Sequence, residues 1–256
     1  MITSVIQPAD ARAHGLSRTA GGETPQGLTY SVAETIEEVT EAWQLLYRAY
    51  LRAGYIKTNP FGIHTVPQAV GPRAVVILGR IRGVTVSTIT AMIDGPRGLP
   101  LDSVYQHELD ALRARGTTLM EVGLFGDRRD IVGEQDDRTF TAVFELMRFT
   151  FSFGRGEGVD FVCGIPPRRS RLYGRSFGFQ AIGAPTTYST VEDNPVQLMW
   201  ADTAQSVANA NRHRAIDYFL KNPVPAEEFA RRFSFAPEAM AGSDLEQYLL
   251  YKQQES

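Results

Sequence analysis

The sequence predicts an α/β (α+β) fold, with a mixed central sheet flanked by helices and a C-terminal helical extension. Three observations lead to this prediction. Segments with β-type alternation and segments with helical periodicity follow one another along most of the chain. Some β segments are joined by short turns and others by helices, an order that is typical of a mixed sheet with helices packed on it. After about residue 200 the pattern is helical only.

Turn residues and capping signals delimit the expected elements. Thr35 and Glu38 form a capping box at the start of the first helix, and Gly54 is placed to end it. Asp102 is expected to cap a second helix, and Gly154 to end a third. The expected strands are 28–32, 74–81, 84–93, 117–125, 159–165, 179–182 and 187–200, and the expected helices are 36–53, 102–115, 140–153 and 169–176.

The chain of 256 residues is long enough for one sizeable core and an appendage. We expect a flexible leader at 1–27, an α/β domain at 28–200 and a helical extension at 201–256. The segment 55–73 is a long loop rich in proline and glycine, and loops of this length are often functional.

Composition excludes several classes of function. The net charge is −3, which gives no indication of a nucleic-acid partner. No apolar run approaches the ~18 residues of a membrane helix, and the first residues lack the apolar segment of a secretory signal. Cys163 is the single cysteine, and the four histidines are dispersed. We therefore expect a cytoplasmic protein with no disulfide, no metal site and no integral membrane contact.

Four stretches resemble one superfamily of enzymes. They are PPRRSRLYGRSFGF at 166–179, YRAYLRAGYI at the end of the first helix, GLPLDSVYQHELDALRARG at 98–116 and MEVGLF at 120–125. Together with the element order, they resemble the GNAT acyltransferases, and within that superfamily the N-acyl amino acid synthases and the related homoserine lactone synthases. The resemblance covers roughly residues 28–200 and implies a GNAT-like fold.

Three departures qualify the resemblance. Arg169 stands where the N-acyl amino acid synthases usually have histidine, and the Ser-Arg pair of homoserine lactone synthases is absent after Glu121. The stretch GDRRDIVGEQDDR contains no window that fits the loop with which acetyl-CoA-using relatives bind pyrophosphate. This last departure favours a donor presented on acyl carrier protein, although an inactive relative would show the same loss.

The resemblance places two catalytic candidates on the sheet and beside it. Glu121 lies in a predicted central strand, where partial burial would raise its pKa and suit a general base for an amine. Tyr173 could donate a proton to the departing thiolate or bind the pantetheine sulfur. The alternatives are a structural hydrogen bond for Glu121 and core packing for Tyr173. Cys163, in an apolar strand, is expected to be a buried and unreactive thiol.

Further residues are assigned to binding by the same resemblance. Arginine forks bind phosphate well and would also attract an acidic carrier protein. Aromatic residues around the long loop would border the acyl chain and the acceptor, whereas His64 in that loop is expected to be solvated. The expected donor-binding residues are Leu124, Phe125, Arg128, Arg129, Arg168, Arg169 and Arg171, and the expected acceptor or acyl-chain residues are Arg48, Tyr50 and Tyr55.

The function most favoured by these features is transfer of a fatty acyl group from an acyl carrier protein thioester to the amino group of an amino acid. No permanently bound cofactor is expected, because the phosphopantetheine thioester, or acyl-CoA, is a substrate. One alternative is an acetyl-CoA-dependent N-acetyltransferase. Another is a non-catalytic GNAT-like module that binds an acyl ligand or a partner protein.

Overall fold

The structure, a computed structural model, describes residues 27–128 and 136–254. Its described residues form one seven-stranded sheet with the strand order β1-β2-β3-β4-β5-β7-β6. The strands are β1 (Leu28–Val32), β2 (Ala74–Ile81), β3 (Val84–Ile93), β4 (Leu119–Asp127), β5 (Asp160–Ile165), β6 (Gln180–Tyr188) and β7 (Asn194–Ala201). The α-helices are α1 (Ile36–Ala53), α2 (Asp102–Arg113), α4 (Asp136–Glu157), α5 (Ser170–Phe177), α6 (Thr203–Ala208), α7 (Arg214–Lys221), α8 (Ala226–Ala230), α9 (Pro237–Met240) and α10 (Asp244–Gln254).

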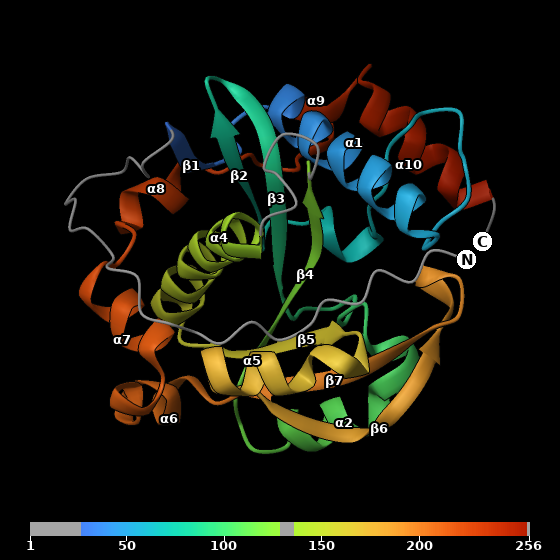
Figure 1. Ribbon diagram of the computed structural model, residues 1–256. Coiled ribbons are helices and arrows are strands. Elements are labelled where there is room, and N and C mark those ends of the chain that lie inside the picture. The colour runs from blue at the N-terminus through green and yellow to red at the C-terminus, as the bar shows by residue number, and fades with distance from the viewer. Residues whose placement is uncertain (1–26, 129–135, 255–256) are drawn as a thin grey trace.

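The sheet is mixed, as predicted. All neighbouring strands are antiparallel except β4 and β5, which are parallel. β4 and β5 pair only from Leu119 with Asp160 to Glu121 with Val162, while β5 stays paired with β7 to its end at Ile165. Beyond Glu121 the two strands therefore separate, and Figure 1 shows β5 running across the lower half of the molecule, away from the upper part of β4.

A β-bulge in β4 lies in the separated part of the strand. Thr90 of β3 pairs with Gly123 and Thr88 with Gly126, so two residues of β4 lie opposite one residue of β3. Leu124, inside the bulge, has a φ of 50°. A bulge bends a strand locally and increases its twist.

Helices cover both faces of the sheet, and in Figure 1 β2 to β4 run between α4 and α1. Two glycines allow these helices to approach closely. A Cβ at Gly126 of β4 would lie 2.9 Å from the Cα of Leu46 in α1, and one at Gly154 of α4 would lie 2.7 Å from Met120 Cε. The two contacts fix α1 and α4 against β4, on opposite sides of the strand that carries Glu121.

The C-terminal helices contribute to both core clusters. Leu245 and Tyr248 of α10 are almost fully buried and pack with the buried residues of α1. Phe219 of α7 and Phe229 of α8 pack with aromatic residues of α4. The backbone N–H of Phe233 also donates to Ala33 O at 2.7 Å. No described helix is long and apolar enough to cross a membrane.

Several details differ from the sequence-based expectations. Gly154 lies inside α4 instead of ending it, because the absence of a side chain is needed for packing on the sheet. Asp102 is the first residue of α2, and its carboxylate accepts a hydrogen bond from Leu99 N at 2.6 Å instead of capping the helix. Glu38 accepts from Glu34 N, so the capping box is formed only on the Thr35 side.

The C-terminal strand boundaries were also predicted incorrectly. The expected strands at 179–182 and 187–200 are replaced by β6 and β7 with a tight turn over residues 189–193. Glu192 and Asp193 in that turn have positive φ angles of 50° and 56°. Apolar residues on both sides of the turn gave the appearance of one long strand.

Candidate active site

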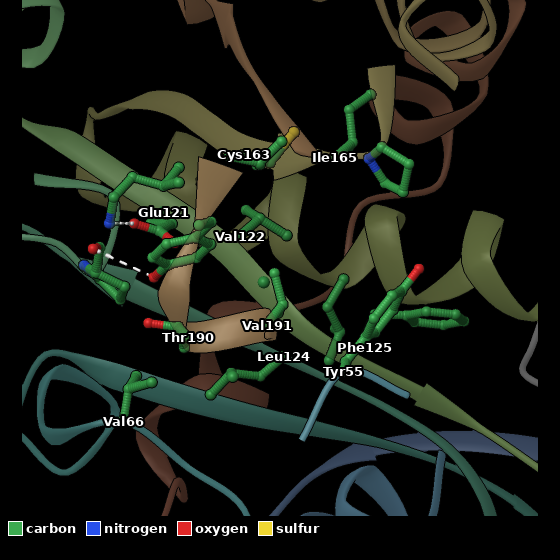
Figure 2. A pocket seen from close by; sticks show the side chains of 18 of the residues that line it. Tyr55, Val66, Glu121, Val122, Leu124, Phe125, Cys163, Ile165, Thr190 and Val191 are labelled. Carbon is green, nitrogen blue, oxygen red and sulfur yellow. Dashed lines mark hydrogen bonds between the residues drawn. The ribbon is translucent and has the colours of Figure 1, made fainter. Parts of the chain in front are cut away.

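A cavity of about 160 Å³ lies where β4 and β5 separate. Its walls come from β4 residues from Glu121 onward and β5 residues from Cys163 onward. Residues of α1, the long loop, α4, α5 and the β6–β7 turn close it. Figure 2 shows Glu121 and Val122 beside Cys163 at the strand junction, with Thr190 and Val191 near Leu124. Most of the lining is apolar or aromatic, which is typical of small-molecule sites.

Glu121 is the buried acidic residue of this cavity. Its side chain is on β4, the residue is 6% exposed, and Oε2 accepts a hydrogen bond from Leu101 N at 3.0 Å. Oε1 has no hydrogen-bond partner among the residues that the structure describes. Burial raises the pKa of Glu121 to about 8; the Leu101 N–H opposes this shift, and the charges of Asp102 and Asp94 add to it. A carboxyl group with such a pKa can exchange a proton near neutral pH.

Tyr173 reaches the same cavity from the other face of the sheet. Glu121 pairs with Met92 and Val162, whose side chains belong to the core on the α1 and α2 face. Tyr173, on α5, instead packs edge-on against Phe177 and Phe179 in the core on the α4 face. The separation of β4 and β5 therefore joins two half-sites, one on each face.

The hydroxyl of Tyr173 and the thiol of Cys163 are both protonated at neutral pH. Burial raises the pKa of Tyr173 to about 12, and nearby Cys163 adds to the shift while Arg169 opposes it. Burial also raises the pKa of the Cys163 thiol well above its ordinary value. Because the thiolate is the nucleophilic form, Cys163 is poorly suited to attack a thioester, and its predicted burial is confirmed.

Polar and aromatic side chains surround the half-site on the α1 face. The ring of Tyr50 lies 5.6 Å from Tyr55 and 5.2 Å from His64 between centroids. His64 is not solvated as expected: its Nε2 is buried without a partner among the described residues, and burial lowers its pKa to about 4. The Tyr188 hydroxyl donates to Pro100 O at 3.3 Å, and burial raises the pKa of Tyr188 to about 12.

The structure brings only part of the expected site together. Glu121, Tyr173, Leu124, Phe125, Tyr50 and Tyr55 all line the cavity. Arg48, Arg128, Arg168, Arg169 and Arg171 do not line it, and Arg129 lies outside the described residues. Arg168 and Arg171 are exposed beside α5, near Tyr173, and Arg48 is exposed on α1.

Sequence reasoning missed the contribution of the β6–β7 turn. Tyr188, Thr190 and Asn194 line the cavity from this turn. The run Glu192-Asp193-Asn194-Pro195 is rich in turn-forming residues and could have indicated it. Reading 187–200 as one strand hid these residues.

Comparison with known proteins agrees with this architecture. The family model of N-acyl amino acid synthase FeeM matches residues 41–202. The solved structure of FeeM, an N-acyl amino acid synthase from uncultured soil microbes, has 23% identity and a TM-score of 0.64, with 75% of this chain and 96% of FeeM covered. A search of curated protein sequences finds no match.

Two more distant structures also superpose. TofI, in a ternary complex with an inhibitor and MTA, has 17% identity and a TM-score of 0.52, with 73% of this chain and 98% of TofI covered. A GNAT-family acetyltransferase from Streptococcus pneumoniae has 14% identity and a TM-score of 0.45, with coverages of 68% and 98%. The predicted α/β fold, with a mixed central sheet flanked by helices, is confirmed. The chain is an N-acyltransferase, and it belongs to the FeeM family of N-acyl amino acid synthases.

Proposed function

We propose that the protein transfers a fatty acyl group from an acyl carrier protein thioester directly to the amino group of an amino acid, in the cytoplasm. The observation that carries this proposal is the pair of half-sites. Glu121, with one free carboxylate oxygen, and the protonated hydroxyl of Tyr173 line one cavity from opposite faces of the sheet. The acceptor amine meets Glu121, and the thioester sulfur lies near Tyr173.

Glu121, Tyr173 and water are sufficient to move every proton in this reaction. The amine nitrogen attacks the thioester carbonyl carbon, and Glu121, directly or through water, takes a proton from the nitrogen. The C–N bond forms, the C–S bond breaks, and Tyr173 gives its proton to the departing sulfur. Water returns the proton from Glu121 to the Tyr173 oxygen. Holding the amine and the thioester together in the opening between β4 and β5 lowers the entropic cost of bringing the two reactants into contact.

The carrier-protein donor is supported by the arginines beside α5. Arg168, Arg169 and Arg171 make no ion pair with any described residue, and they directly precede Tyr173 along the chain. Carrier proteins are acidic, so an uncompensated basic surface at this place would steer docking of the pantetheine arm. With Arg128 and Arg129 they remain our candidates for donor binding, and Leu124 and Phe125 for contact with the donor inside the cavity.

We assign the acyl chain and the acceptor to the half-site on the α1 face of the sheet. Phe61 of the long loop contacts Tyr248 and Tyr251 of α10, with ring centroids 6.1 and 5.6 Å apart. We propose that this loop and the C-terminal extension at 201–256 together cover the bound acyl chain beside Tyr50 and Tyr55. Arg48, on the exposed side of α1, is our candidate for contact with the acceptor carboxylate at the rim.

Mass spectrometry of lipids tests the proposal. Cells expressing the chain, the Glu121→Gln variant and the Tyr173→Phe variant are extracted in parallel. New N-acyl amino acids, reduced in both variants, are the expected result, and their masses name the acceptor and chain length. No new product, with the purified protein also inert toward acyl-carrier, acyl-CoA and acetyl-CoA donors across amines, would instead indicate a binding module.

A further inference from the structure

The carboxylate of Glu121 is held by a turn that has little freedom to move. The turn runs from Gly98 to Asp102 between β3 and α2, and Leu101 supplies the N–H that Glu121 Oε2 accepts. Leu99 and Leu101 are each 1% exposed, so both side chains anchor the turn in the core. The position of the Leu101 N–H therefore depends on the geometry of this turn.

Arg113, in the last turn of α2, ties this turn together. Its NH1 and NH2 donate to the two carboxylate oxygens of Asp102, each at 2.8 Å, and its Nε donates to Asp94 Oδ2 at 2.6 Å. Asp102 Oδ2 in turn accepts from Leu99 N at 2.6 Å. The fork thus connects the end of β3, the start of α2 and the backbone of the turn, and such bidentate pairs fix geometry well.

Glycine at position 98 is a condition for this arrangement. Gly98 has a φ of 64°, and a Cβ there would lie 2.4 Å from Asp102 Oδ2. A side chain would therefore displace the carboxylate that Arg113 holds. The turn therefore needs glycine at position 98 to keep Asp102 in its place.

We infer that Arg113 is a positioning residue for Glu121, since it fixes the turn whose Leu101 N–H holds and orients the Glu121 carboxylate. This inference rests on the proposed function for its catalytic meaning, but the geometric effect on Glu121 does not depend on it. Arg113 does not line the cavity, so it acts through the turn and not on the substrate.

The charges around Glu121 also make its protonation depend on Arg113. Asp94 and Asp102 both raise the pKa of Glu121, and Arg113 is the cation that pairs with both. Tyr50, Tyr188 and Cys163 also face Glu121, and all three are protonated at neutral pH. Arg113 pairs with Asp110 as well, so its loss would leave three carboxylates without their cation. Two of them, Asp94 and Asp102, act on Glu121, and the loss would also loosen the Leu101 N–H; each change disfavours the ionised form of Glu121.

Infrared titration of the purified full-length chain tests this inference. The protonated Glu121 carboxyl band is assigned by its loss in Glu121→Gln, and its titration is followed in the wild type, Arg113→Gln and Arg113→Lys. Arg80→Gln is the matched control, because Arg80 forms a comparably buried pair with Glu38 at 2.8 Å that joins β2 to α1 and does not involve the turn. Circular dichroism verifies the folded state of each variant.

We expect the titration midpoint of Glu121 to rise by about one pH unit or more in Arg113→Gln, by less in Arg113→Lys, and not in Arg80→Gln. The pH–rate profile for acyl transfer should move with it, giving about a tenfold lower rate at pH 7. An unchanged midpoint in both Arg113 variants, or an equal shift in Arg80→Gln, would overturn the inference. A shifted midpoint without a shifted rate profile would leave the positioning role intact and contradict the proposed catalytic role of Glu121.

Discussion

The buried carboxyl group of Glu121 makes a specific prediction about stability. Replacing Glu121 with glutamine keeps the size of the side chain and an oxygen that can accept the Leu101 N–H, but removes the titration. Because the pKa of Glu121 is about 8 in the folded chain and 4.5 ordinarily, the folded state binds more protons between these pH values. Unfolding then releases a proton, so the free energy of unfolding falls as the pH rises through this window.

The size of this effect follows from the same two values. One pKa unit corresponds to about 1.36 kcal/mol, so a difference of about 3.5 corresponds to up to about 5 kcal/mol. This stabilisation is fully present below pH 4.5 and is lost by the time the pH exceeds 8. The free energy of unfolding of Glu121→Gln, minus that of the wild type, should therefore increase by up to about 5 kcal/mol from pH 4.5 to 8 and then stay constant.

Urea unfolding of the two proteins at half-unit pH intervals from 4.5 to 9 measures this difference. Taking the difference cancels the contributions of the other titrating groups, which the two proteins share. A curve that stays within about 1 kcal/mol over the whole range would refute the reasoning, because it would mean that Glu121 titrates alike in the folded and unfolded chains.

Three further predictions concern Tyr173, Cys163 and two glycines of α4. Tyr173→Phe should lower kcat about 100-fold with an alkyl thioester. The loss should be much smaller with an aryl thioester, because its leaving group needs no proton. Equal losses with both substrates would contradict proton donation by Tyr173. Because attack is direct, Cys163→Ala should retain activity within about tenfold of the wild type, and no variant should yield an acyl-cysteine in intact-mass spectra. A loss of activity above about 1,000-fold in Cys163→Ala would favour a covalent route. Gly154→Ala should destabilise the fold by about 1–3 kcal/mol, because the added Cβ would overpack the contact with the sheet. Gly156→Ala has open space around the added Cβ and should stabilise the fold by about 0.5–1 kcal/mol. Thermal unfolding of both variants checks this contrast.

The strands and helices with clear periodicity could be predicted from the sequence because each has one buried face. α1 is the best example: its capping threonine and terminal glycine delimit it at the expected residues. The failure at Gly154 has its cause in tertiary packing. Gly154 was expected to end a helix on local propensity, but the contact of α4 with Met120 keeps the helix intact there. Propensity is readily overridden by such packing.

The candidate site was predictable in its chemistry but not in its shape. Glu121 is predictable as a site residue because a carboxyl group in an apolar strand needs a hydrogen bond or a cleft, and the structure provides both. The separation of β4 from β5 depends on strand pairing between distant residues, which periodicity does not encode. The arginines could be predicted to be basic but could not be placed. The sequence does not show that Arg168 lies outside the cavity lining.

The central claim is direct acyl transfer with Glu121 as the base. Its most direct test is the rate of thiol release from an acyl-carrier protein thioester by purified protein, with and without amino acid acceptors, in the wild type and in Glu121→Gln. We expect acceptor-dependent release that falls by about 100- to 10,000-fold in the variant while the protein stays folded. Acceptor-dependent release at the wild-type rate in Glu121→Gln would contradict it.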